Sequence, residues 1–137
     1  MSAEENKAIL NKYMDAVNRH DAMSAISLFS DDFMDRSAPP GMPNGKEGFL
    51  MAHQILETAL PDVHFSTDKI VVDGDKIGWV ATGTGTNTGP FFGIPATGKP
   101  VKWWGVRILR IQNGKIVEAW ALFDMFGILQ QMGIIPS

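Results

Sequence analysis

The stretch GKIVEAWALFDMFGILQQMG, residues 114–133, decides how the rest of the chain is interpreted. It contains a tight turn, an alternating run typical of a β-strand, and a short run with helical spacing. It also places one carboxylate, Asp124, among apolar neighbours: Trp120, Leu122, Phe123, Met125, Phe126, Ile128 and Leu129. A charge is costly in apolar surroundings unless it is paired or protonated. We therefore expect Asp124 to have a buried partner or a chemical role, with the rest of the chain forming the walls around it.

Upstream of this stretch, a spacing of two residues predicts three further strands, at about 62–72, 76–88 and 100–112. The strand inside the opening stretch covers about 115–124. The turns Asp73-Gly74-Asp75 and Gln112-Asn113-Gly114 supply the residues that tight hairpins need. The four strands are therefore predicted to form an antiparallel meander.

The N-terminal half has helical spacing instead. Residues 3–18 predict an amphipathic helix with a capping box formed by Ser2 and Glu5. A short second helix begins after Asp21 and reaches position 29, a third covers 46–60, and residues 125–133 return to helical spacing. Two Gly- and Pro-rich segments, at 37–45 and 88–100, are predicted to be loops over a site or plain surface connections. The fold class is α+β, with helices packed on one face of a curved antiparallel sheet.

Composition excludes several function classes. The chain has 137 residues, enough for one domain that spans 1–137, and a net charge of −3 with both signs dispersed. The sequence has no basic stripe of the kind that would indicate binding to nucleic acid or to an anionic membrane. There is no cysteine, and the three histidines have no metal-ligand spacing. Because the N-terminus is acidic and polar, we expect no signal peptide and a cytoplasmic protein.

Alternation along 100–112 places Arg107 on an otherwise apolar face. We expect it to point into a pocket and to pair with Glu118 or Asp124, because a buried arginine needs a carboxylate. Such a pair could simply fix the strand register, or Arg107 could hold an anionic intermediate. The opposite face carries Trp104, Val106 and Ile108, which predicts a homodimer interface.

The chain resembles the SnoaL-like polyketide cyclase family of the nuclear-transport-factor-two-like superfamily. The resemblance covers nearly the whole chain and rests on the order and spacing of several short motifs. These are Pro61-Asp62, Gly74-Asp75, the run 83–89 (GTGTNTG), the run 92–99 (FGIPATGK), Arg110, the run 113–118 (NGKIVE), Trp120, Asp124 and the run 129–133 (LQQMG).

This resemblance implies a cone-shaped, strongly curved sheet, of the kind described as an α+β barrel, closed by helices over an apolar pocket. It also implies a homodimer without metal or organic cofactor. An aspartate at the position of Asp124 would act as acid and base in an intramolecular aldol condensation. At Arg36 and Asn87 the family pattern commonly has histidine, and both positions are expected to line the pocket.

The predicted catalytic residues are therefore Asp124 and Arg107. The predicted substrate-binding residues are Arg36, Phe33, Asn87, Phe92, Trp103 and Trp120. The expected ligand is a small apolar or aromatic molecule, and the expected reaction is a cyclisation or isomerisation of a carbonyl compound. Two alternatives remain open: a binding protein without turnover, and a hydrolase resembling limonene epoxide hydrolases, in which Asp124, Arg107 and Asp35 would surround a water molecule.

Overall fold

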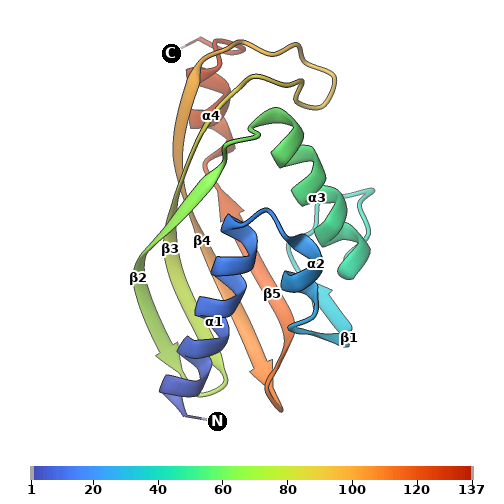
Figure 1. The fold of residues 1–137 in the computed structure, drawn as a ribbon, viewed down its shortest axis with the longest axis vertical. Helices are drawn as coiled ribbons and strands as arrows, with labels where there is room; N and C mark the ends of the chain where they lie inside the picture. Colours follow the sequence, from blue (N-terminus) through green and yellow to red (C-terminus); the bar gives the residue numbers. More distant parts are fainter. Residues whose placement is uncertain (1, 137) are drawn as a thin grey trace.

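The structure, a computed structural model, describes residues 2–136. Its elements are α1 (Ala3–Asn18), α2 (Ala22–Ile26), β1 (Phe29–Asp35), α3 (Lys46–Ala59), β2 (His64–Asp73), β3 (Lys76–Thr86), β4 (Pro100–Gln112), β5 (Lys115–Phe123) and α4 (Met125–Gln131) (Figure 1). The strands form one sheet in the order β1-β5-β4-β3-β2. The predicted α+β class is confirmed, and the curved sheet stays open, since β1 and β2 form its two edges.

Local sequence signals account for most element ends. The Ser2 hydroxyl accepts a hydrogen bond from the Glu5 amide while the Glu5 carboxylate accepts one from the Ser2 amide, so the predicted capping box begins α1. Residues Asn113 and Gly114 both have positive φ angles, 51° and 76°, which a two-residue hairpin between β4 and β5 requires. At the end of α3, Pro61 follows the capping residue, Leu60, and prevents further helix.

The strand β1 is the element that the sequence did not predict. Its sequence, FSDDFMD, has two adjacent acidic residues and no period-two alternation of apolar side chains. It pairs in parallel with β5, with Phe29 opposite Ile116 and Asp35 opposite Ala119. The antiparallel meander predicted for the other four strands is confirmed, and the fifth strand makes the sheet mixed.

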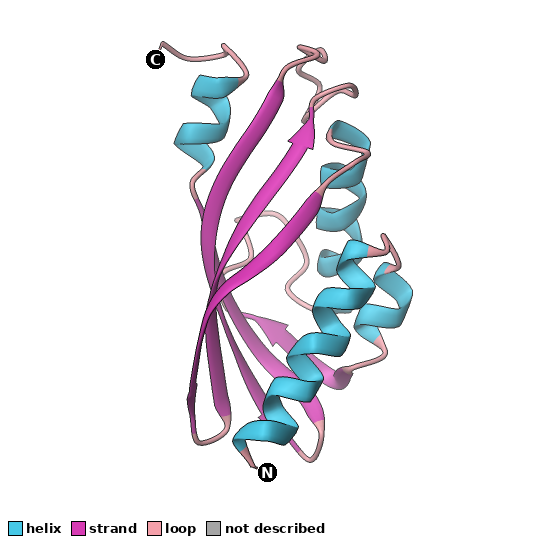
Figure 2. Cartoon of the chain, turned by 60° about the vertical axis from the view of Figure 1, so that its left-hand side comes forward, coloured by secondary structure: helices cyan, strands magenta, loops and turns pink. Residues whose placement is uncertain are grey.

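Helices α1, α2 and α3 lie along one face of the twisted sheet (Figure 2). The core between them is aromatic at its centre. The Tyr13 ring of α1 lies about 6 Å from the rings of Phe29, Phe49 and Trp79, with centroid distances of 6.1, 6.0 and 6.2 Å. Asn18, at the end of α1, holds the sheet through two hydrogen bonds of 2.8 and 2.9 Å to the backbone of Phe65. Among the described residues, no helix is long and apolar enough to span a membrane.

A bulge in β5 changes which side chains face the helices. Arg110 pairs with Glu118 and Ile111 pairs with Ile116, so Val117 is an extra residue without a partner on β4. Strict alternation would have placed Ile116, Glu118, Trp120, Leu122 and Asp124 on one face. With the extra residue, Ile116 stays buried, but Glu118 shares the opposite face with Arg110.

Candidate active site

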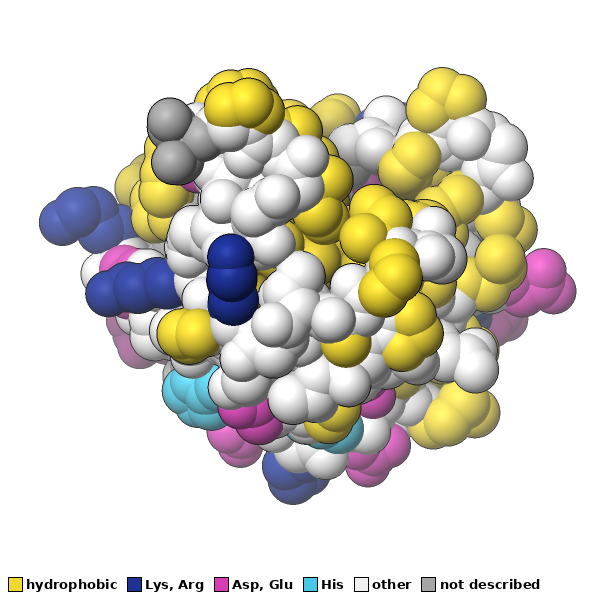
Figure 3. Space-filling model, turned by 90° about the horizontal axis from the view of Figure 1, so that it is seen from above, with side chains coloured by type: hydrophobic (Ala, Val, Ile, Leu, Met, Phe, Trp, Pro, Cys, Tyr) yellow, Lys and Arg dark blue, Asp and Glu magenta, His cyan; other side chains and the backbone are white. Residues whose placement is uncertain are grey.

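A cavity of about 350 Å³ lies between α1, α3 and the inner face of the sheet. Helix α4 and the two predicted Gly/Pro loops complete its wall. Seen from the end where α4 lies, hydrophobic side chains gather around a hollow in the surface (Figure 3). The volume falls within the range of pockets that hold small organic ligands.

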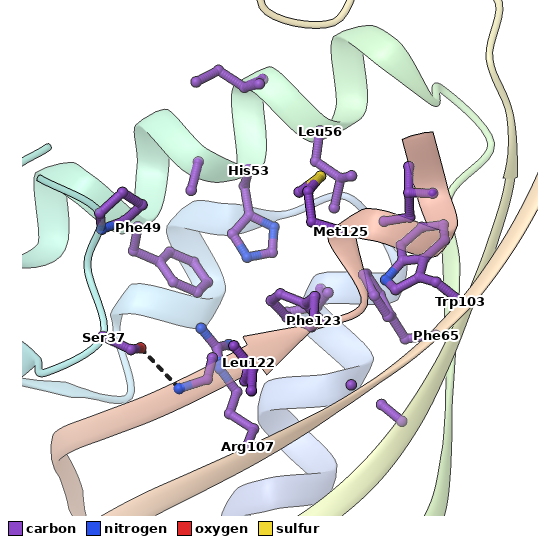
Figure 4. Close-up of a pocket in the computed structure, with 18 of the residues that line it drawn as sticks. Ser37, Phe49, His53, Leu56, Phe65, Trp103, Arg107, Leu122, Phe123 and Met125 are labelled. Carbon is purple, nitrogen blue, oxygen red and sulfur yellow. Dashed lines mark hydrogen bonds between the residues drawn. The ribbon is translucent and has the colours of Figure 1, made fainter. Parts of the chain in front are cut away.

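Arg107 of β4 points into this cavity, as the alternation predicted (Figure 4). The expected carboxylate partner is absent, because no described acidic group lies within 4.0 Å of its guanidinium. Instead, Nη1 donates a hydrogen bond to the Tyr13 hydroxyl, and the guanidinium carbon lies 5.7 Å from the centre of the Tyr13 ring. The buried Nε has no partner. Arg107 is therefore a cation without a counter-ion on an apolar wall.

Two further titratable side chains share this part of the cavity. His53 of α3 points inward and packs at a tilt of 38° against Phe49, with ring centroids 4.1 Å apart (Figure 4). Burial, with Arg107 and His20 nearby, lowers the pKa of His53 from 6.5 to about 3. Burial raises the pKa of Tyr13 above its usual range, while Arg107 opposes that rise and Asp35 adds to it. Both side chains are consequently neutral at pH 7.

Asp35 supplies a carboxylate to the cavity wall, and its hydrogen-bond partner is the nearby residue Ser37. It accepts hydrogen bonds from the amide and the hydroxyl of Ser37, at 2.9 and 2.6 Å. The Ser37 hydroxyl in turn accepts one from the Ala121 amide at 2.8 Å (Figure 4). These bonds join the segment after β1 to β5.

Three predicted binding residues lie on the cavity wall: Trp103, Phe92 and Asn87. Trp103 is buried and packs edge-to-face with Phe65, while Phe92 is exposed at the tip of its loop. The Asn87 side chain is fully occupied by the protein. Its amide donates to the carbonyls of Ala59 and Gly89, and its oxygen accepts from the amide and hydroxyl of Thr97. Asn87 therefore holds the loop that follows β3 and has no free donor for a ligand.

Asp124 occupies a different environment from the one predicted. It is exposed and caps α4, where its carboxylate accepts a hydrogen bond of 3.0 Å from the Gly127 amide. The expectation of desolvated, apolar surroundings was wrong, because the apolar neighbours in sequence point elsewhere. Phe123 and Met125, on either side of it, line the cavity, so Asp124 stands beside the cavity and not on its wall.

The other predicted site residues lie away from the cavity. Phe33 is in the core, stacked on Phe29 at 4.1 Å. Trp120 pairs with Ile108 on the outer side of the sheet, where the β5 bulge turns it. Arg36 is also outside. It donates to Glu118 at 2.6 Å, and Arg110 donates to the same carboxylate at 2.8 Å. Glu118 is thus the partner of these two arginines and not of Arg107.

Sequence reasoning missed Tyr13 and His53 as cavity residues. His53 stands four residues after Phe49 and three before Leu56, on the inward face of α3. That spacing was a usable signal. No sequence signal indicated that Tyr13 lines the cavity, since an aromatic residue on the apolar face of a helix indicates core packing. Among the described residues, no three His, Cys, Asp or Glu side chains lie close enough to hold a metal ion.

The sequence and the structure are similar to those of known proteins. Residues 7–132 match the family described as SnoaL-like polyketide cyclase. Among solved structures, AclR from Streptomyces galilaeus, a proposed hydroxylase, is 29% identical with a TM-score of 0.90, over 99% of this chain and 85% of that one. IdmH from Streptomyces antibioticus, a proposed polyketide cyclase, is 27% identical with a TM-score of 0.82, over 93% and 98%. A proposed polyketide cyclase from Bacillus cereus is 25% identical with a TM-score of 0.85, over 98% and 87%. No protein with a curated description matches the sequence.

Proposed function

Since the chain belongs to the SnoaL-like polyketide cyclase family, we propose that it is a small-molecule enzyme of the polyketide cyclase type. It takes a flat, apolar or aromatic carbonyl compound into the cavity and moves a proton on the carbon beside a carbonyl group. The observation that supports this most directly is Arg107, a cation without a counter-ion on the wall of a ligand-sized apolar cavity. Such a cation stabilises negative charge that develops on a bound oxygen.

The proposed reaction is an intramolecular aldol cyclisation or an isomerisation. A base takes the proton from the carbon beside the carbonyl, and the electron pair moves onto the carbonyl oxygen to form an enolate. The enolate carbon then bonds to a second carbonyl carbon of the same molecule, and the resulting alkoxide takes the proton back. Arg107 would hold the enolate oxygen. No oxidant, reductant or cofactor enters this balance.

Asp124 is the proposed proton acceptor. One of its carboxylate oxygens caps α4, and its two chain neighbours line the cavity. The reacting carbon would therefore have to lie at the cavity mouth, with the rest of the substrate reaching inward toward Arg107. His53 is the competing candidate, because it lies inside the cavity and is neutral. Burial and the nearby Arg107 lower the pKa of His53, which disfavours a proton on its ring during the reaction.

We also propose that the protein works as a cytoplasmic homodimer. The outer face of the sheet carries exposed apolar side chains, including Trp104, Val106 and Ile108, and Val106 also borders the cavity. The hydrolase alternative needs two aspartates and an arginine around one water molecule. Asp35 and Arg107 share the cavity wall, but Asp124 does not, so this arrangement is not formed.

Hydrogen–deuterium exchange tests the proposal without the natural substrate. The wild-type protein should accelerate exchange of the protons beside the carbonyl of 2-acetylnaphthalene in D₂O, followed by ¹H NMR. Asp124→Asn should lower the catalysed rate by about 10²–10⁴-fold, the usual contribution of a general base, with little change in ligand affinity. Asparagine also caps helices well, so α4 should remain folded.

Two variants make the result specific. Asp73→Asn removes an exposed carboxylate at the end of β2 that does not line the cavity, and should leave the exchange rate unchanged. If His53→Gln abolishes exchange while Asp124→Asn retains it, the base is His53. Absence of any acceleration by the wild-type protein, with ligand bound, would indicate a binding protein without turnover and would reject the proposed function.

A further inference from the structure

The inner end of the cavity holds an unusual set of polar groups for an apolar site. Arg107, Tyr13 and His53 come from β4, α1 and α3, and all three line the same space. Of these, the histidine and the tyrosine are neutral, so the inner end carries one net positive charge. The Asp35 carboxylate, elsewhere on the wall, is held by Ser37.

The hydrogen bonds of Arg107 leave part of its guanidinium unused. A guanidinium has five N–H donors arranged for two parallel bonds to a carboxylate. Here one terminal nitrogen donates to Tyr13, the buried Nε has no partner, and the other terminal nitrogen, Nη2, has no hydrogen-bond partner and is not fully buried. Since Arg107 lines the cavity, Nη2 is available to a bound molecule.

We infer that Arg107 binds a carboxylate of the substrate, so that the protein selects an aromatic or polyketide-type acid over the corresponding neutral compound. This inference rests on the proposed function and deepens it by naming the substrate class. An enolate could use the same donors, but it exists only during the reaction. A carboxylate is charged throughout, and it supplies two oxygens for the Arg107 donors and a neighbouring acceptor for a proton on His53.

His53 provides a readout that a merely structural arginine would not move. Its imidazole has no hydrogen bond among the described residues and faces Arg107 across the cavity (Figure 4). Burial is the main cause of its lowered pKa, and the charged groups Arg107 and His20 lower it further. A carboxylate bound at Arg107 would cancel part of this repulsion and offer a hydrogen bond to the protonated ring. The pKa of His53 should then rise.

The experiment compares 2-naphthoate with 2-naphthamide, which has the same shape and no charge. By isothermal titration at pH 7, wild-type protein should bind the naphthoate about tenfold or more tightly than the naphthamide, as expected for a charge-assisted pair. Arg107→Met should reduce this ratio to about one. Arg110→Met removes an arginine from the same strand on the outer side, where Glu118 retains Arg36, and should leave the ratio unchanged.

A second measurement needs no variant. In wild-type protein with ¹³C-labelled histidine, saturating naphthoate should raise the pKa of His53 from about 3 by roughly one pH unit or more, and naphthamide should leave it unchanged. Equal affinity for the two compounds, or an unchanged His53 titration with naphthoate bound, would overturn the inference. Because proton exchange is tested on a neutral ketone, that failure would leave the proposed function standing. If the protein selects naphthoate but catalyses no proton exchange, the inference about Arg107 stands and the proposed function is rejected.

Discussion

Arg107 and His53 show how one cavity fixes the charge of its own side chains. Arginine stays protonated in proteins, so burial cannot remove its charge. Histidine can lose its proton, and the nearby cation makes that loss more favourable. The result is one permanent charge beside one neutral ring, an arrangement that neither residue type predicts alone.

The depressed pKa of His53 should make the protein less stable in mild acid. The unfolded chain binds a proton at His53 near pH 6.5, whereas the folded chain resists it until about pH 3. Stability is therefore complete above pH 6.5 and is lost as the pH falls below it. Between pH 7 and pH 5 the free energy of unfolding should fall by about 1–2 kcal/mol from this group.

Urea unfolding at several pH values measures this slope. His53→Gln should flatten the curve in that window, although it also removes the ring packed against Phe49. The matched control is His64→Gln, which changes an exposed histidine at the start of β2 and should keep the wild-type slope. Parallel slopes for His53→Gln and wild type would show that the histidine is solvated in the folded state.

At the scale of the element, β5 explains why sequence reasoning placed Arg107 correctly and Trp120 wrongly. Strand β4 has no extra residue in its pairing with β3 or β5. Simple alternation along β4 therefore predicts its buried face correctly. In β5, the extra residue Val117 reverses the faces beyond it, and Glu118 and Trp120 turn outward. A bulge depends on pairing between strands, so the sequence of β5 alone carries no signal for it.

Gly83 lies in the interior of β3, and a glycine at such a position often marks the close approach of another group. The structure shows that the close approach is by Trp103 on the neighbouring strand. A Cβ atom at position 83 would lie 2.5 Å from two carbons of its indole ring. Gly83→Ala should therefore force the Trp103 ring into the cavity, lowering the free energy of unfolding by about 1–3 kcal/mol and weakening ligand binding.

Tryptophan fluorescence and urea unfolding test this variant together. Gly78→Ala, in the same strand, is the control, because its Cβ would have no neighbour nearer than 3.5 Å. It should keep wild-type stability and fluorescence, and alanine suits an extended strand better than glycine does. A Gly83→Ala protein with wild-type stability and ligand affinity would show that the indole ring moves aside freely.

For the whole molecule, periodicity and turn residues predicted the α+β class and the meander β2–β5, but not β1. The capping box, the hairpin at Asn113-Gly114 and the switch from helical to strand spacing are local signals, and each produced the expected element. The parallel pairing of β1 with β5 and the position of Asp124 depend on contacts between distant segments. Consequently the walls of the cavity were more predictable than the orientation of the polar groups in it.

The two faces of the sheet lead to the last prediction. Helices cover one face, while the other exposes large apolar side chains on β4: Trp104, Val106 and Ile108, of which Val106 also borders the cavity. Contiguous exposed apolar surface of this kind is typical of protein interfaces, and we expect two copies to pack these faces together.

A charge placed in the middle of such an interface would lose its hydration without gaining a partner. Ile108→Lys should therefore raise the dimer dissociation constant at least about tenfold. Sedimentation velocity at micromolar concentration should show a wild-type dimer and an Ile108→Lys monomer with unchanged circular dichroism. The control Met23→Lys alters an even more exposed apolar residue, on α2 and away from the sheet face, and should remain dimeric. A wild-type monomer under these conditions would mean that this face serves a different partner or none.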